Sequence, residues 1–256
     1  MGQRKALSIG IFDSGIGGFS ILKKIHELAP ELEVYYIADQ GFAPYGNKSR
    51  KEVIDRCHYL CHELMKFDLD LIVVACNTAT GVAIDELRNT FTIPFVGVEP
   101  FVNALSKHTW KESDRACVIT TELMSKSERF QKLVNRLDPD KRLFYKVTPG
   151  LATIVEDFFI NKNEEELNLK LKEELSFVGE SSYSHLILGC THYPLIAKYI
   201  EATTGASVLS PCLYVANRVL SLLDLSSGES SETFQFASTA KEDVLRFVSK
   251  DFSNLP

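Results

Sequence analysis

The sequence contains LIVVACNT at residues 71–78 and HLILGCTH at residues 185–192, two segments built in the same order. Each is a short apolar run that ends in a cysteine and two polar residues. Such a run predicts a buried strand, and the periodic stretch that follows each one predicts a helix. The two cysteines, Cys76 and Cys190, are 114 positions apart. Each is expected at the carboxyl end of a strand, directly before a helix.

The similarity between the two halves extends beyond these segments. FVGVEP at 95–100 resembles ASVLSP at 206–211, with the two prolines 111 positions apart. The first strand leads to Asp13, and its counterpart leads to Thr121, 108 positions later. Because three matches share a nearly constant offset, the sequence predicts two α/β lobes of like topology.

Short β-branched runs alternate with amphipathic stretches along most of the chain. The predicted strands are 8–12, 34–38, 71–75, 95–98, 116–120, 143–147, 186–189, 207–209 and 233–238. The predicted helices are 19–28, 48–66, 78–89, 195–203 and 241–248. This pattern is typical of α/β proteins, in which helices cover both faces of mainly parallel sheets. Ligands of such Rossmann-like lobes bind beyond the carboxyl ends of the strands, so we expect both cysteines to face one cleft between the lobes.

The composition excludes several classes of protein. The 256 residues are 45% hydrophobic and 24% charged, which excludes a disordered chain or a coiled coil as the main architecture. A net charge of −6, without a dense basic stretch, argues against binding to nucleic acid or to an anionic membrane surface. The longest apolar run is too short to span a membrane, and no signal peptide is recognisable. Six scattered cysteines do not form a disulfide scaffold, so we expect a soluble cytoplasmic protein with free thiols.

The two duplicated cysteines suggest a specific chemistry. A thiol at a helix N-terminus faces unpaired N–H groups, so we expect both Cys76 and Cys190 to favour the thiolate. Two thiols on opposite sides of one substrate carbon can remove a proton from one face and return it to the other. That reaction inverts a stereocentre without oxidation or reduction. The alternatives are two buried apolar residues that end core strands, or a thiol oxidoreductase with the two cysteines close together.

Other residues are candidates for the same cleft. Asp13 and Ser14 follow the first strand within IGIFDSGIGG, whose glycines allow the backbone to approach a ligand closely. A dinucleotide-binding loop, with Asp39 on the ribose, is a rival interpretation, although the sixth position of the loop is Ser20 and not glycine. His192 lies two residues after Cys190. Because histidine titrates near neutral pH, it is a candidate to polarise or protonate the Cys190 thiol.

A second cluster has the spacing of a metal site. CHYLCH at 57–62 places two cysteines and two histidines four positions apart on one predicted helix. However, Cys57 and Cys61 lie on an apolar stripe with Val53, Leu60 and Leu64. We therefore expect both cysteines in the core, and we expect no metal site.

Five motifs together identify a family resemblance. IGIFDSGIGG, YYIAD followed by PYGNKS, VVACNTAT, FVGVEP and LGCTHYPL resemble the cofactor-independent glutamate racemases in order and spacing, over nearly the whole chain. The resemblance implies two α/β lobes related by pseudo-twofold symmetry, with the substrate between them. It implies interconversion of L- and D-glutamate for bacterial peptidoglycan, with neither a metal nor pyridoxal phosphate. The implied lobes are residues 1–98 plus 211–256, and residues 99–210; the sequence does not decide whether the protein forms a homodimer.

The resemblance also implies roles for individual residues. Cys76 matches the thiol that takes the proton from D-glutamate, and Cys190 the one that acts on L-glutamate. Asp13 and His192 match residues that assist the two thiols. The implied substrate contacts, with an acidic residue near them, are Ser14, Pro44, Tyr45, Gly46, Asn77, Thr78, Thr121, Thr191 and Glu156.

The chain departs from the family pattern in its second lobe. Three positions after Thr121, where the family has another threonine, stands Met124, which supplies no hydroxyl. Thr148 and Thr153 replace the usual Cys and Pro. These departures leave open a racemase of another acidic amino acid, such as aspartate. A non-catalytic Rossmann-like binding protein, which would need no thiol, is the alternative from another class.

Overall fold

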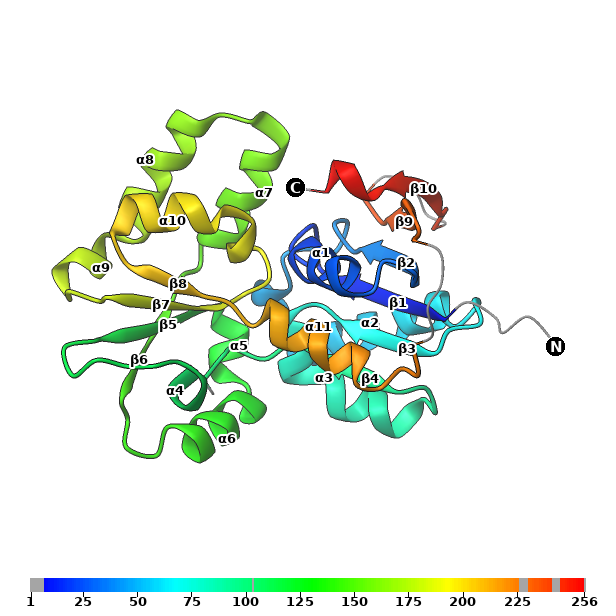
Figure 1. The fold of residues 1–256 in the computed structure, drawn as a ribbon, viewed down its shortest axis with the longest axis horizontal. Coiled ribbons are helices and arrows are strands. Elements are labelled where there is room, and N and C mark those ends of the chain that lie inside the picture. Colours follow the sequence, from blue (N-terminus) through cyan, green and yellow to red (C-terminus); the bar gives the residue numbers. More distant parts are fainter. Residues whose placement is uncertain (1–6, 103, 226–229, 241–244, 256) are drawn as a thin grey trace.

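The computed structural model describes residues 7–102, 104–225, 230–240 and 245–255 and contains two sheets that lie side by side (Figure 1). The first sheet has the strand order β10-β9-β2-β1-β3-β4. Its strands are β1 Ser8–Asp13, β2 Glu33–Ala38, β3 Leu71–Val74, β4 Phe95–Gly97, β9 Thr233–Ser238 and β10 Val248–Asp251. All neighbours are parallel except β9 and β10, which are antiparallel.

The second sheet is entirely parallel and has the order β6-β5-β7-β8. Its strands are β5 Ala116–Thr120, β6 Leu143–Val147, β7 His185–Gly189 and β8 Ser207–Leu209. This order repeats β2-β1-β3-β4 of the first sheet strand for strand. The repeat that the sequence predicts is therefore confirmed, since Cys76 follows β3 and Cys190 follows the equivalent β7.

Helices cover both faces of each sheet (Figure 1). Around the first sheet lie α1 Phe19–Leu28, α2 Arg50–Leu64, α3 Asn77–Thr90 and α11 Cys212–Leu220. The second sheet is accompanied by α4 Ala104–Lys107, α5 Glu122–Lys126, α6 Glu128–Leu137, α7 Leu151–Asn161, α8 Glu164–Glu174, α9 Ser176–Glu180 and α10 Ala197–Thr204. Short 3₁₀ turns occupy Tyr45–Asn47, Tyr193–Ile196 and Phe252–Asn254.

Alternation along β1 shows how one strand supports two cores. Ile9 and Ile11 pack with residues of α1, such as Leu22, on one face of the sheet. Phe12 points to the other face and packs with Leu60 of α2. All six residues of β1 are buried, as expected for a central strand covered on both sides. The position of Asp13 at the end of this strand is therefore held by the centre of the lobe.

Nearly every predicted element is present with bounds that differ by a few residues. The predicted helix 195–203 corresponds to α10, preceded by the 3₁₀ turn that contains Pro194. The prediction of a closing helix over 241–248 falls partly on residues 241–244, which lie outside the described residues. Over residues 245–248 it is wrong, because residues 245–247 form no regular element and Val248 begins β10, which pairs with the free edge of β9. Within the described ranges, no helix combines the length and apolar character that a membrane crossing requires.

Candidate active site

A cavity of about 370 Å³ is lined by both duplicated cysteines, Cys76 from the first lobe and Cys190 from the second. The other predicted site residues that line it are Ser14, Pro44, Tyr45, Gly46, Asn77, Thr78, Thr121, Glu156, Thr191 and His192. Of the predicted set, only Asp13 is absent from the wall, because it is completely buried behind it. The prediction that the two strand ends face one space is confirmed.

Several residues of the cavity wall were not predicted from the sequence. They are Gln40, Ala43, Asn47, Glu122, Pro149, Ala152, Thr153, Ile160 and Ala240. Gln40 follows β2, and Pro149 follows β6, so both lie just beyond carboxyl ends of strands. Their position directly after a predicted strand is the sequence feature that could have identified them. None of the described residues in the wall is an arginine or a lysine.

Cys76 is the N-cap of α3, and its sulfur accepts a hydrogen bond from the backbone N–H of Ala79 at 3.4 Å. The thiol in turn donates to the Ser14 hydroxyl at 3.8 Å. Burial raises the pKa of Cys76 far above its usual value, and the charge of Asp13 raises it further. The expectation that the helix N-terminus would favour the thiolate is therefore wrong for Cys76. The single N–H contact does not offset the loss of water around a sulfur that is 4% exposed.

Cys190 is linked to a histidine and a carboxylate. Its sulfur lies 3.7 Å from Nδ1 of His192, and Nε2 of the same ring lies 2.8 Å from Oε1 of Glu156. Burial disfavours the charged imidazole, but its hydrogen bonds with Cys190 and Glu156 outweigh this effect. The pKa of His192 is therefore raised well above its usual value. The chain of three groups can hold a proton beside the Cys190 sulfur and exchange it.

Glu156 of α7 joins the two lobes. Besides His192, its carboxylate accepts hydrogen bonds from the backbone N–H of Ile16 at 3.1 Å and from Nε2 of Gln40 at 3.4 Å. Burial would raise the pKa of Glu156, yet the hydrogen bond and the charge of His192 lower it below the usual value. The charged carboxylate thus fixes the imidazole of one lobe against the loop after β1 of the other.

Asp13 lies below the floor of the cavity and also contacts both lobes. One oxygen accepts the N–H of Gly18 at 2.7 Å, and the other accepts the hydroxyl of Thr191 at 3.4 Å. Burial raises the pKa of Asp13 to about 6, although the positive charge of His192 opposes the rise. Asp13 therefore titrates closer to neutrality than an ordinary carboxyl group.

The polar residues at the start of α3 meet the second lobe directly. The hydroxyls of Thr78 and Thr121 are 2.9 Å apart and form a hydrogen bond across the lobes. The amide of Asn77 donates to the carbonyl of Val98 at 3.4 Å. Its Oδ1 atom is buried and has no partner among the described residues. An unpaired buried acceptor in a cavity wall is suited to a donor group on a ligand.

Asp39 has a different role from the one that a dinucleotide site would require. It accepts hydrogen bonds from the Tyr45 hydroxyl at 2.6 Å and the Thr239 hydroxyl at 2.8 Å, and it forms a 2.5 Å ion pair with Arg56. Both carboxylate oxygens are thus engaged within the protein and are not presented to a ribose. The network holds the Pro44–Tyr45–Gly46 turn against the cavity.

The histidine–cysteine cluster on α2 contributes to packing. Cys57 and Cys61 are fully buried in the core between α2 and the first sheet, as predicted. The rings of His58 and His62 both pack against Phe91. All six cysteines of the chain lie within the described residues, and each is a free thiol. Cys76 and Cys190 are therefore not joined by a disulfide.

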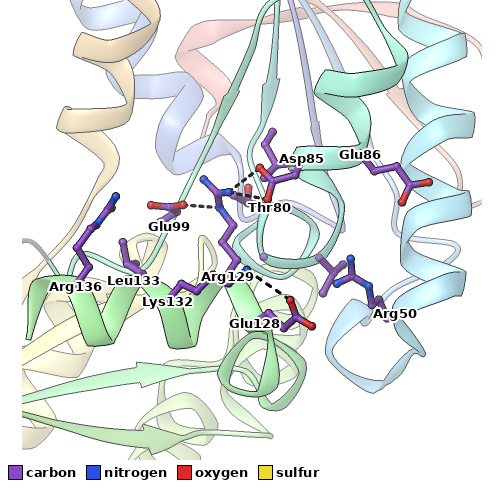
Figure 2. Close-up of a pocket in the computed structure, with 13 residues that line it drawn as sticks. Arg50, Thr80, Asp85, Glu86, Glu99, Glu128, Arg129, Lys132, Leu133 and Arg136 are labelled. Atoms are coloured by element: carbon purple, nitrogen blue, oxygen red, sulfur yellow. Dashed lines mark hydrogen bonds and ion pairs between the residues drawn. The ribbon is translucent and has the colours of Figure 1, made fainter. Parts of the chain in front are cut away.

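A second cavity, of about 310 Å³, lies between α3 and α6 (Figure 2). Charged side chains dominate it, and Arg129 is the central one. Its guanidinium contacts Glu99 at 2.6 Å and Asp85 at 2.8 Å. These ion pairs connect α6 with α3 and with the segment after β4. The cavity contains neither cysteine and is separate from the candidate active site.

A family model described as Asp/Glu/Hydantoin racemase matches residues 9–219 of the chain. Among curated proteins, the chain is similar to a glutamate racemase from Aliarcobacter butzleri (strain RM4018). The two are 36% identical over 223 residues, which is 84% of each chain.

Among solved structures, the chain is likewise similar to glutamate racemases. The chain is similar to a glutamate racemase isoform from Bacillus anthracis, with 30% identity and a TM-score of 0.74, covering 86% of this chain and 82% of that one. It is also similar to a glutamate racemase from Francisella tularensis in complex with D-glutamate. Here the identity is 25% and the TM-score 0.73, with coverage of 91% and 88%. The predicted arrangement of two α/β lobes is thus confirmed by the structure and by its neighbours.

Proposed function

Because the chain belongs to the Asp/Glu/Hydantoin racemase family, we propose that it is a glutamate racemase that uses Cys76 and Cys190 as its two proton-transfer groups. The observation that carries this proposal is the presence of both cysteines in the wall of one cavity between repeated lobes. The enzyme is an isomerase with a small-molecule substrate. In this proposal it works in the cytoplasm, without a cofactor, and supplies D-glutamate for peptidoglycan.

We propose that the substrate lies with its α carbon between the two sulfurs. In the direction from L- to D-glutamate, the Cys190 sulfur takes the α proton, and the electron pair of the broken C–H bond moves into the α carboxylate. The Cys76 thiol then delivers its own proton to the opposite face of the carbon. The raised pKa of Cys76 suits this step, since a thiol must carry a proton in order to donate it. The reverse direction exchanges the two roles.

Acidic and basic neighbours return each cysteine to its starting state. His192 is placed to exchange a proton with Cys190, and Glu156 stabilises the charged imidazole. Asp13 acts on Cys76 through its charge and is itself tied to Thr191 beside Cys190. The two thiols are thus supported differently, one by a cationic histidine and one by a carboxyl group that titrates near neutrality.

The rest of the cavity supports recognition of an amino acid with two carboxylates. Hydroxyls of Ser14, Thr78 and Thr121 and the amide groups at the start of α3 are donors of the kind that bind carboxylates. The unpaired Oδ1 of Asn77 is an acceptor for the substrate ammonium group. We further propose that the lobes comprise residues 1–98 plus 211–256, and residues 99–210.

The test is direct. Purified protein is incubated with L-glutamate without added cofactor and, in parallel, with EDTA, and the optical rotation or the enantiomeric ratio is followed. The proposal predicts that D-glutamate accumulates until the two enantiomers are equal. L-Aspartate in the same assay distinguishes the alternative substrate. Turnover of aspartate without turnover of glutamate would contradict the substrate that we propose.

A further inference from the structure

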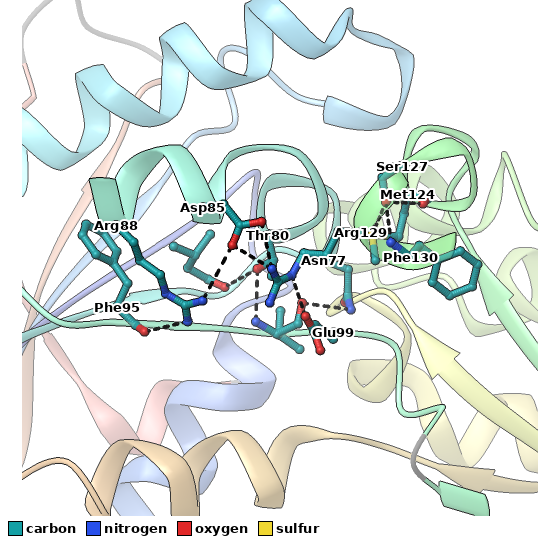
Figure 3. Close-up of polar contacts among 12 residues, drawn as sticks. Asn77, Thr80, Asp85, Arg88, Phe95, Glu99, Met124, Ser127, Arg129 and Phe130 are labelled. Carbon is teal, nitrogen blue, oxygen red and sulfur yellow. Dashed lines mark hydrogen bonds and ion pairs between the residues drawn. The ribbon is translucent and has the colours of Figure 1, made fainter. Parts of the chain in front are cut away.

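The short helix α5 of the second lobe packs directly on the backbone of α3, the helix whose N-cap is Cys76. The contact is made at Gly81, where a Cβ atom would lie 2.5 Å from Sδ of Met124 and 3.1 Å from Oγ of Ser127. Glycine in a helix interior costs about 1 kcal/mol relative to alanine. Its presence at this position is explained by the close approach of Met124 (Figure 3 shows Met124 with Ser127).

The side chain of Met124 is packed on the sides that do not face Gly81 as well. Its side chain is completely buried and belongs to the core cluster that contains Phe101, Val118 and Phe130. The hydroxyl of Ser127 donates to the Met124 carbonyl at 2.9 Å, so the turn after Met124 is also fixed. A change in the packing of Met124 is therefore expected to shift α5, because Met124 is the buried residue that anchors this helix.

The same short helix controls a residue of the active-site wall. Thr121 is the N-cap of α5, and its hydroxyl accepts the backbone N–H of Met124 at 3.4 Å. This hydroxyl forms the 2.9 Å bond with Thr78, which lies three residues before Gly81 on α3. The Met124–Gly81 contact and the Thr121–Thr78 contact are thus two ends of one seam between α5 and α3. Met124 itself does not line the active-site cavity.

Of the two helices, α5 is the one that would yield if the seam were disturbed. Nine of the fourteen residues of α3 are buried, whereas Met124 is the single buried residue among the five of α5. Farther along, Arg129 of α6 ties the second lobe to Asp85 of α3, which keeps the helices together at a distance from the site (Figure 2). A substitution at position 81 or 124 is therefore expected mainly to displace Thr121.

We propose that Met124, packed on the bare backbone of Gly81, is a positioning residue that sets Thr121 against Thr78 and thereby tunes the affinity of the site for its substrate. The inference rests on the proposed function, because it assigns Thr121 and Thr78 to the substrate site. It also explains how the chain tolerates a methionine where a second hydroxyl was expected. Met124 acts through the position of Thr121, without touching the substrate.

The experiment compares Met124→Ala, Gly81→Ala and the double variant with the wild-type protein. Each single change is expected to raise KM for glutamate about tenfold, with a smaller effect on kcat, because Thr121 moves while the cysteines stay in place. In the double variant, the added methyl group at position 81 occupies part of the space left by Met124. Its KM is therefore expected to fall back toward the wild-type value, below that of Met124→Ala.

Gly179→Ala is the matched control, because Gly179 lies in α9 and a Cβ there would meet no atom within 4 Å. Its KM should equal that of the wild type. Because the two enantiomers have equal free energies, every variant must change kcat/KM by the same factor in both directions. The comparison of directions is therefore uninformative for kcat/KM, and kcat and KM are compared separately. Calorimetric titration with an equimolar mixture of D- and L-glutamate, which is already at equilibrium and undergoes no net conversion, measures the same loss of affinity.

Three outcomes would overturn the inference. They are an unchanged KM in Met124→Ala, a double variant that is no better than Met124→Ala, and a purely additive effect of the two changes. If Gly81→Ala alone does not fold, the comparison of Met124→Ala with the double variant decides the question. Failure of the wild type to racemise glutamate would instead contradict the proposed function, and the calorimetric comparison would still decide the role of Met124.

Discussion

Oε1 of Glu156 lies 2.8 Å from Nε2 of His192, and this bond connects α7 to the loop that carries Cys190. The same carboxylate reaches the other lobe through the N–H of Ile16. The negative charge of Glu156 therefore favours the protonated form of His192. Its hydrogen bonds to His192 and Ile16 hold the two lobes together at this point. These two effects can be separated by a substitution that keeps the shape and removes the charge.

Glu156→Gln is expected to lower the pKa of His192, because it removes the negative charge that stabilises the imidazolium. The alkaline limb of the kcat/KM profile should then move to lower pH, and kcat/KM at pH 8 should fall by about tenfold or more. Asp157→Asn, one position along the same helix, is the control, since Asp157 pairs with Lys170 away from the site. An alkaline limb that stays in place would contradict the role of Glu156.

Asp13 should make the stability of the protein depend on pH. Its pKa is raised from 3.8 to about 6, so the folded protein binds this proton more tightly than the unfolded chain. Between about pH 4 and pH 6 the contribution of Asp13 to stability falls as pH rises, by about 3 kcal/mol in all. Urea unfolding of wild type and Asp13→Asn at pH 4 and pH 7 measures it. The variant should gain stability relative to wild type at the higher pH, and a difference that does not vary with pH would contradict the expectation.

Gly17 allows the loop after β1 to approach His192. A Cβ at this position would lie 2.5 Å from Nδ1 of His192 and 2.8 Å from its backbone nitrogen. Gly17→Ala is therefore expected to displace the imidazole from Cys190 and to lower kcat by about 10²-fold, with the circular dichroism of the fold retained. Gly179→Ala again serves as the control. Wild-type kcat in Gly17→Ala would show that the position of His192 is unimportant for turnover.

Much of the fold could be predicted from the sequence because the second lobe repeats the first. Cys76 and Cys190 follow equivalent strands, and the parallel topology then brings both strand ends to one cavity. The polar residues that adjoin these cysteines in sequence, such as Thr78 and His192, could be placed for the same reason. Their closeness to the cysteines in the sequence was sufficient to place them in the site.

Contacts between distant segments could not be predicted in this way. The packing of Met124 on Gly81 depends on how closely two helices approach, which no local pattern encodes. The pKa of Cys76 was mispredicted because the helix N-terminus can be read from the sequence, whereas the degree of burial cannot. The antiparallel strand β10 was missed since its four residues are exposed and show no alternation.

The most direct test of the two-thiol mechanism follows the α proton of glutamate in D₂O with Cys76→Ser and Cys190→Ser. Wild-type protein should form D-glutamate that carries deuterium at the α carbon. Each variant should lose about 10³-fold or more of its racemisation rate. Cys76→Ser should still exchange the α proton of L-glutamate, and Cys190→Ser that of D-glutamate. Racemisation at the wild-type rate in both variants would contradict the account.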